Sequence, residues 1–206
     1  MKILHINASP RGDESQSLDI ANTFLFELQK DKAVQIDQLD LFAADLPPFG
    51  TVATSAKMAL FTGRDQTEEE VAAWAAVRAV FDRFANADLY VLNVPIWNNG
   101  IPYILKQFID LVTQPGWSFG FDPEAGYSGL MTGRKAVLVH ASGVWHQDIG
   151  PNFGSDFSTP FLEDWLTFIG IEDVQHLRVQ PTVLNANYAA TKAEAKRQST
   201  ALASAY

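Results

Sequence analysis

The sequence contains no cysteine, and this absence excludes several kinds of chemistry. Without cysteine, the 206-residue chain has no disulfide framework, no Cys-ligated zinc, no iron–sulfur cluster and no thiol nucleophile. No His, Asp or Glu pairs repeat at the spacing typical of metal ligands, so no metal site is predicted. Any redox reaction of this chain would therefore need a bound cofactor.

Basic residues and long apolar runs are also scarce. The chain has 15 Lys and Arg against 24 Asp and Glu, a net charge of −9 that repels polyphosphate and argues against nucleic-acid binding. No stretch reaches the roughly 18 apolar residues of a membrane span, and the apolar run in MKILHINASP is too short for a signal peptide. We therefore expect a soluble, cytoplasmic protein that binds no membrane.

Several nucleotide-binding and hydrolytic motifs are missing as well. The sequence has neither G-x-G-x-x-G nor a Walker A loop, which argues against an NAD-binding fold with a glycine-rich fingerprint and against an NTPase. It has no G-x-S-x-G elbow, because Gly154-Ser155 lacks the second glycine of that motif. A serine hydrolase is therefore not expected.

Short apolar runs do alternate with amphipathic ones along the whole chain, which predicts βαβ units. With 47% hydrophobic and 19% charged residues, we expect one globular domain over 1–206. It would be an α/β doubly wound parallel sheet of five strands in the order 2-1-3-4-5, with helices on both faces. The predicted strands are 2–8, 34–42, 88–95, 135–141 and 174–180, and the predicted helices are 17–30, 67–86, 101–113, 161–169 and 188–204.

Two segments interrupt this alternation. Residues 43–66 form a long excursion, and insertions of that length are more often functional than idle. It ends where Thr67 and Glu70 predict a capping box at the start of a helix. Residues 117–122 are expected to form a hairpin or a loop.

Ligands of such a sheet bind beyond the carboxyl ends of the strands, here the loops 9–17, 95–100 and 141–146. The first loop carries Ser9, Ser15 and Ser17 and leads into a helix, so hydroxyls, backbone N–H groups and the positive helix end converge there. This arrangement suits a phosphate, with Arg11 as an additional donor. The alternative is that these serines are turn and cap residues.

The other two loops are suited to a flat ring. Residues 95–100 combine Trp97, Asn98 and a glycine in a rigid loop that could present apolar faces and donors to an isoalloxazine ring; for Trp97, ordinary packing is the alternative. In the next loop, Ser142 or the amides would meet ring carbonyls and Gly143 allows close backbone approach. His146 would donate a proton or hydrogen bond, or else cap the loop. The remaining histidines lie in predicted strands, where packing explains them: His5, His140 and His176.

Aromatic residues crowd the second half of the chain. Most are expected in the core, and any that are exposed would form an aromatic cleft or a subunit interface. These residues are Trp117, Phe119, Phe121, Phe153, Phe157, Phe161 and Trp165.

Taken in order along the whole chain, these features resemble the flavodoxin-like FMN-dependent NADH-azoreductases, which are relatives of the NAD(P)H:quinone oxidoreductases. The residues that carry the resemblance are Ser9, Ser15-Gln16-Ser17, Pro95-Ile96-Trp97-Asn98, Ile101-Pro102, Leu105-Lys106, 117–121, Gly129-Leu130, Thr132-Gly133 and 159–171.

The resemblance implies a homodimer with FMN at each subunit boundary, which oxidises NADH or NADPH and reduces quinones or azo compounds. It implies that the FMN phosphate is held by Ser9, Ser15, Gln16 and Ser17. It also implies that the ring is lined after strand three by Pro95, Ile96, Trp97, Asn98 and Asn99, and that its pyrimidine edge meets Ala141, Ser142, Gly143 and Val144.

Two departures from the family pattern stand out. Family members commonly carry a Ser-Arg-Gly-Gly type segment at 141–144, and an aromatic residue where this chain has Asn99. Because backbone donors survive such changes, we expect them to alter nucleotide preference and acceptor range more than FMN binding. No basic cluster for a 2′-phosphate is visible, which favours NADH over NADPH.

On this basis we hypothesise a ping-pong reaction in which donor and acceptor occupy the same flavin face in turn. The backbone amide of Asn98 would contact N5, and His146 with Phe121 or Trp165 would form the acceptor pocket. Two alternatives remain: a non-enzymatic electron carrier of the flavodoxin type, and a module that senses flavin or nicotinamide redox state. The length of the 43–66 excursion argues against the carrier.

Overall fold

The computed structural model describes the backbone of residues 1–206 and all side chains except that of Asp31. Its centre is a five-stranded parallel sheet in the order β2-β1-β3-β6-β7, which confirms the predicted 2-1-3-4-5 order. The sheet strands are β1 (Lys2–Asn7), β2 (Gln35–Asp40), β3 (Leu89–Pro95), β6 (Lys135–Ala141) and β7 (Asp173–Val179).

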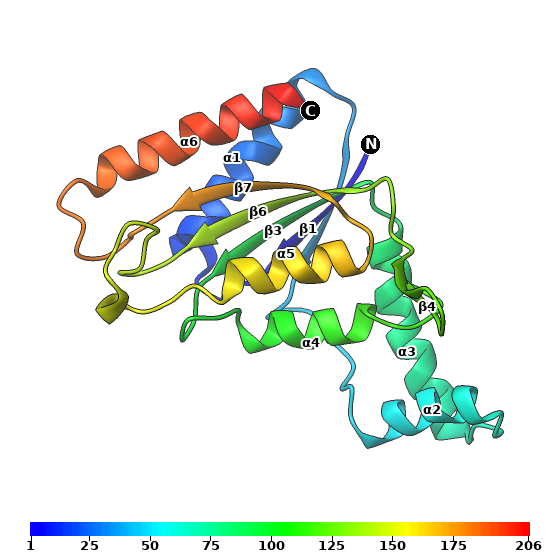
Figure 1. Cartoon of the computed structure of the whole chain (residues 1–206). Helices are drawn as coiled ribbons and strands as arrows, with labels where there is room; N and C mark the ends of the chain where they lie inside the picture. The colour runs from blue at the N-terminus through cyan, green and yellow to red at the C-terminus, as the bar shows by residue number, and fades with distance from the viewer.

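Helices cover both faces of this sheet (Figure 1). The first and last helices pack on one face, and α3, α4 and α5 pack on the other, so the sheet lies between two apolar cores. The helices are α1 (Gln16–Asp31), α2 (Thr51–Thr62), α3 (Glu68–Ala85), α4 (Tyr103–Val112), α5 (Ser158–Phe168) and α6 (Tyr188–Ala205), with 3-10 turns η1 (Gly12–Glu14) and η2 (Pro151–Phe153).

The central strands are apolar almost throughout because both of their faces are covered. In β3 every residue from Leu89 to Val94 is buried, with Leu92 and Val94 in the core beneath α4 and α5 and Leu89 and Val91 in the core beneath α1. The edge strands are less buried: in β2 only Leu39 is buried, and in β7 only Leu177 and Val179 are buried. The buried central strands therefore hold the sheet in place, and the loops that follow them meet at its carboxyl edge.

The 43–66 excursion contains the helix α2, which the sequence pattern does not predict. Its buried face consists of Ala53, Ala56 and Ala59, small residues that bring α2 close to α3 but give only a weak helical hydrophobic pattern. The predicted capping box of α3 is confirmed: the Thr67 hydroxyl accepts from the Glu70 amide, and the Glu70 carboxylate accepts from the Thr67 amide at 2.8 Å.

Two predicted element boundaries shift for local reasons. The predicted second strand includes residues 41–42, but the Asp40 carboxylate accepts hydrogen bonds from the Phe42 and Ala43 amides and turns the chain there. The helix predicted at 161–169 begins earlier, at Ser158, because the Asp156 carboxylate accepts from the Ser158 and Thr159 amides, both at 2.9 Å.

The 117–122 segment belongs to an antiparallel hairpin of β4 (Phe119–Asp122) and β5 (Gly126–Gly129). The hairpin packs against the end of α5, where a Cβ on Gly129 would come within 2.2 Å of the Gly170 backbone nitrogen. Because it precedes β6, the hairpin lies at the amino end of the sheet, opposite the arrowheads in Figure 1. Its Phe121 is 61% exposed.

Among the described residues, no helix combines the length and the apolar character needed to cross a membrane.

Candidate cofactor-binding site

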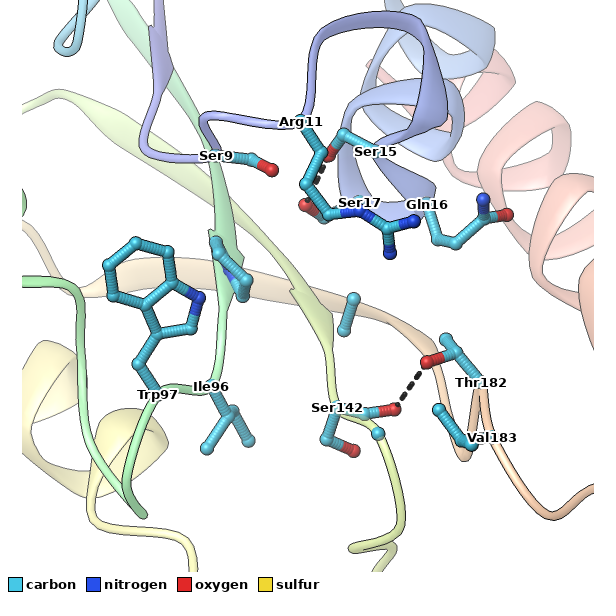
Figure 2. A pocket seen from close by; sticks show the side chains of 13 residues that line it. Ser9, Arg11, Ser15, Gln16, Ser17, Ile96, Trp97, Ser142, Thr182 and Val183 are labelled. Atoms are coloured by element: carbon cyan, nitrogen blue, oxygen red, sulfur yellow. Dashed lines mark hydrogen bonds between the residues drawn. The ribbon is translucent and has the colours of Figure 1, made fainter.

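A groove opens at the carboxyl edge of the sheet, over the ends of β1, β3 and β6 (Figure 2). This is the point where the chain reverses its winding direction, since β1 is flanked by β2 and β3. The cavity measures about 190 Å³. Its lining residues are Ser9, Arg11, Ser15, Gln16, Ser17, Pro95, Ile96, Trp97, Ala141, Ser142, Gly143, Thr182 and Val183.

Hydroxyl groups gather at one end of the groove. Ser9, Ser15 and Ser17 are each at most 3% exposed, and the Ser15 and Ser17 hydroxyls lie 3.3 Å apart. Ser15 also caps α1, because its hydroxyl accepts from the Leu18 amide at 3.3 Å. The cap role considered for these serines is thus real for Ser15, and it places the hydroxyls at the positive end of α1.

A buried polar network supports this loop from beneath. The side-chain amide of Asn93, fully buried in β3, donates to the Asn7 side-chain oxygen at 2.7 Å and to the Ser17 hydroxyl at 3.5 Å. Its own oxygen pairs with His5 Nε2 at 2.9 Å. Asn7 in turn accepts from the Ser9 amide at 3.0 Å, so both ends of the loop are tied to the same network.

Two predicted phosphate-loop side chains have other partners. The Arg11 guanidinium lies 3.3 Å from the Glu14 carboxylate, and both groups are well exposed. Gln16 donates to the Glu14 carbonyl and accepts from the Tyr188 hydroxyl of α6. Both side chains still line the groove together with the hydroxyls, and Figure 2 shows the Arg11 side chain reaching past Ser17 toward it.

The loop after β3 is a two-residue turn. Trp97 and Gly100 exchange both backbone hydrogen bonds at 2.9 Å, and the residues between them, Asn98 and Asn99, have φ angles of 49° and 67°. Asparagine tolerates this left-handed conformation better than most residues, which explains why two asparagines stand here. Among the described residues the backbone amide of Asn98 has no hydrogen-bond partner. Asn99, in contrast, accepts hydrogen bonds just before α5: its side-chain oxygen accepts from the Ser155 amide and its carbonyl from the Phe157 amide.

A family profile described as "Flavodoxin-like fold" matches residues 1–202. An FMN-dependent NADH:quinone oxidoreductase from Ruegeria pomeroyi is 47% identical over 184 residues, which is 89% of this chain and 90% of that protein. The chain belongs to the flavodoxin-like family of the FMN-dependent NADH:quinone oxidoreductases. FMN-dependent NADH:quinone oxidoreductase 3 from Pseudomonas fluorescens is 38% identical over 98% of this chain and 95% of its own length.

A solved structure shares the same architecture. The FMN-dependent NADH-azoreductase from Bacillus anthracis, crystallised in complex with FMN, superposes with a TM-score of 0.90 at 26% identity over 99% of this chain and 98% of its own. The flavodoxin-like fold expected from the resemblance is thereby confirmed.

The groove of this family member fits FMN in its chemistry. The Ser9 hydroxyl has no hydrogen-bond partner among the described residues, and it faces Ser15 and Ser17 at the helix end where a phosphate would bind. At the other end the Asn98 amide remains available, and Ile96 and Trp97 supply apolar surface. Trp97 also packs on Phe42, with ring centroids 5.9 Å apart, so lining and packing are compatible roles.

The third wall of the groove comes partly from a loop that the sequence reasoning missed. Thr182 and Val183 follow β7, and the Thr182 amide donates to the Ser142 and Gly143 carbonyls at 2.9 Å. The Val183 amide donates to the Gly143 carbonyl at the same distance. The signal existed, because the loop after the fifth strand reaches the same edge as the other three ligand loops.

Other predicted site residues lie outside this groove. Asn98, Asn99 and Val144 do not line it, although the turn that holds the first two borders it. The Trp165 side chain is 5% exposed in the core and donates to the Thr113 hydroxyl at 2.9 Å, and it does not line the groove. His146 points to a second cavity beside β7.

Phe121 lies at the opposite end of the sheet from the groove, on the hairpin (Figure 1). Within one chain it is therefore separate from the loops that line the cavity. The packing expected of the strand histidines is confirmed for His5 and His140, which are 3% and 0% exposed. Burial lowers the pKa of both, and that of His140 falls to about 3.

Proposed function

We propose that this chain is an FMN-dependent oxidoreductase that uses NADH to reduce quinones, with azo compounds as further acceptors. One observation carries the proposal: a single groove joins a hydroxyl-lined helix end to an apolar wall with an available backbone amide. The curated relatives named FMN-dependent NADH:quinone oxidoreductase and the azoreductase crystallised with FMN support it.

When bound, FMN supplies two-electron chemistry between a nicotinamide donor and an acceptor. The chain's residues would position it. Ser9, Ser15 and Ser17, with the amides of the α1 end, would hold the phosphate, and the Asn93 network keeps these hydroxyls in place. The Asn98 amide would donate a hydrogen bond to the reactive edge of the ring, and Ile96 and Trp97 would exclude water from one face.

A homodimer also follows as a proposal. Large apolar side chains remain exposed around the groove and on the hairpin, a surface typical of an interface. They include Tyr103, Phe121, Tyr127, Phe153 and Phe157, each at least 56% exposed. Phe121 would then reach the acceptor pocket only from a second subunit, and sedimentation equilibrium should show twice the mass of one chain.

Absorbance spectroscopy tests the catalytic proposal. Purified protein should show the yellow flavin spectrum, anaerobic NADH should bleach it, and a quinone should restore it. The electron-carrier alternative predicts FMN binding without bleaching by NADH or NADPH, and the redox-sensor alternative predicts bleaching without steady-state turnover. A colourless protein that takes up no added FMN would contradict the proposal altogether.

A further inference from the structure

A second cavity lies next to the groove, at the β7 edge of the sheet. It measures about 440 Å³, within the range of about 300–1,000 Å³ common for small-ligand sites. Residues 146–148, alternate residues of β7 and one side of α6 line it, and of the described residues that do so only Pro181 is apolar. Such a wall suits a charged, hydroxyl-rich ligand.

Three cavity-lining side chains, at alternate positions along β7 and just beyond its end, carry buried polar atoms that lack partners. His176 Nδ1, Arg178 Nε and Gln180 Oε1 have no hydrogen-bond partner among the described residues. His140 of the neighbouring strand lies in the core behind them, and its ring stacks on His176 with centroids 5.7 Å apart. Because buried polar groups are nearly always paired, the unpaired atoms of the three cavity-lining side chains indicate a partner from outside the chain.

The chemistry of the atoms indicates what that partner is. Arg178 donates and is cationic, so it requires an anionic acceptor. His176 Nε2 lies 3.0 Å from the Glu163 carboxylate, to which it donates, so Nδ1 of the neutral ring is an acceptor. Gln180 Oε1 is a second acceptor. A ligand that offers a phosphate to Arg178 and hydroxyl groups to the two acceptors would satisfy all three side chains. A nucleotide carries both kinds of group.

The local charge agrees with this assignment. Of the two carboxylates that line the cavity, Glu194 is already engaged by Arg197 and Gln198, and Asp148 is exposed. Burial, and then the charge of Arg178, lower the pKa of both His140 and His176, so both rings are neutral at pH 7.

The same two loops, after β6 and after β7, line both the cavity and the groove. Residues 142–143 line the groove and 146–148 line the cavity, while 180–181 line the cavity and 182–183 line the groove. A dinucleotide whose nicotinamide stacks on an FMN held in the groove would thus have this cavity beside it. We propose that the cavity binds the adenylate half of the donor, with a phosphate on Arg178 and ribose hydroxyls on His176 and Gln180. The choice of donor rests on the proposed function.

Calorimetric titration of the FMN-loaded protein with AMP tests the site without turnover. Wild type should bind AMP, and both Arg178→Gln and Gln180→Leu should weaken binding, the first by about tenfold, as expected for loss of a charge-assisted hydrogen bond. The control Arg78→Gln removes an exposed arginine of α3 that pairs with Asp82, and it should bind AMP as wild type does. Equal melting temperatures would show that the variants fold.

Kinetics then identifies the source of the nucleotide. Arg178→Gln should raise the KM for NADH, while the KM for reduced nicotinamide mononucleotide, which lacks the adenylate half, and that for the quinone should stay unchanged. AMP binding that depends on Arg178 with an unchanged NADH KM would keep the nucleotide site and overturn its assignment to the donor. No AMP binding, or binding insensitive to both variants, would overturn the site. Because the titration needs no turnover, it stands even if the enzyme proposal fails.

Discussion

At the scale of single residues, the groove depends on side chains that do not touch its ligand. Asn93 is fully buried, yet it connects Asn7, His5 and Ser17 within one network. A buried amide is stable only when its hydrogen bonds are satisfied, and here they are satisfied by His5 and Asn7 of β1 and by the Ser17 hydroxyl at the start of α1. We therefore treat Asn93 as a positioning residue.

Replacing Asn93 by Leu should weaken FMN binding more than riboflavin binding. Loss of the side-chain amide leaves His5 Nε2 without its buried partner, which costs about 1–3 kcal/mol, removes one of the two donors to the Asn7 oxygen and frees the Ser17 hydroxyl. We expect FMN affinity to fall about tenfold, with riboflavin affinity nearly unchanged because riboflavin lacks the phosphate. Fluorescence titrations with both flavins measure this.

Tyr90→Phe is the matched control for that experiment. It removes another buried hydrogen bond of β3, from the Tyr90 hydroxyl to the Phe84 carbonyl, without touching the phosphate loop. It should leave the ratio of the two flavin affinities as in wild type. An equal loss of affinity for both flavins in Asn93→Leu would show that the network acts only on stability.

The turn at Asn98 gives a second prediction at this scale. With φ at 49°, a β-branched residue there costs about 1–2 kcal/mol, whereas glycine adopts the same backbone freely. Asn98→Val should therefore weaken FMN binding and slow quinone reduction, and Asn98→Gly should retain both because only the backbone amide is needed. If the two variants behave alike in flavin titration and turnover, the turn does not hold the ring.

At the scale of elements, the interface between α2 and α3 centres on one carboxylate. Glu70 accepts from Arg64 Nη2 at 2.7 Å, from the Ser55 hydroxyl and from the Thr67 amide, and these contacts, with Arg64 first, lower its pKa from 4.5 to about 2. A carboxyl whose pKa is lower in the folded chain stabilises the fold above its unfolded pKa, and this contribution is lost as the pH falls through the folded value.

The stabilising effect of Glu70 should therefore disappear between about pH 4.5 and pH 2. Urea unfolding at pH 7 should show Glu70→Gln to be less stable than wild type, and the difference should shrink at pH 3. Glu172→Gln, at an exposed position, serves as the control and should match wild type at both pH values. A Glu70→Gln difference that is independent of pH would assign the loss to packing instead.

Elements with strong patterns were the ones that the sequence could predict. The buried strands and the Thr67 capping box were found because continuous apolar runs and cap spacing are local signals. Helix α2 was missed because alanines at its buried face carry little hydrophobic contrast. The roles of Asn93 and Thr182 were missed because both arise from contacts between segments that are distant in the chain.

At the scale of the whole molecule, the expected ligand loops did meet at one edge, because every strand of a parallel sheet ends on the same side. Which side chains face the groove could not be read from the order of strands. Trp165 and His146 lie elsewhere, since the helix start and the loop path that orient them depend on packing around α5 and β7. The azoreductase from Bacillus anthracis keeps this fold at 26% identity, so the fold does not depend on most of the individual side chains.

The bonds from Thr182 and Val183 to residues 142–143 have a kinetic consequence. Both amides sit in an irregular segment, and the Val183 side chain is 54% exposed, yet each N–H is held at 2.9 Å by a carbonyl of the loop after β6. Their deuterium uptake should therefore be slow beside that of the Leu184 and Ala186 amides, as measured by exchange and mass spectrometry. Slow uptake would show that these hydrogen bonds hold the loop after β7 against the loop after β6; uptake as fast as at the neighbouring amides would show that the two loops separate readily.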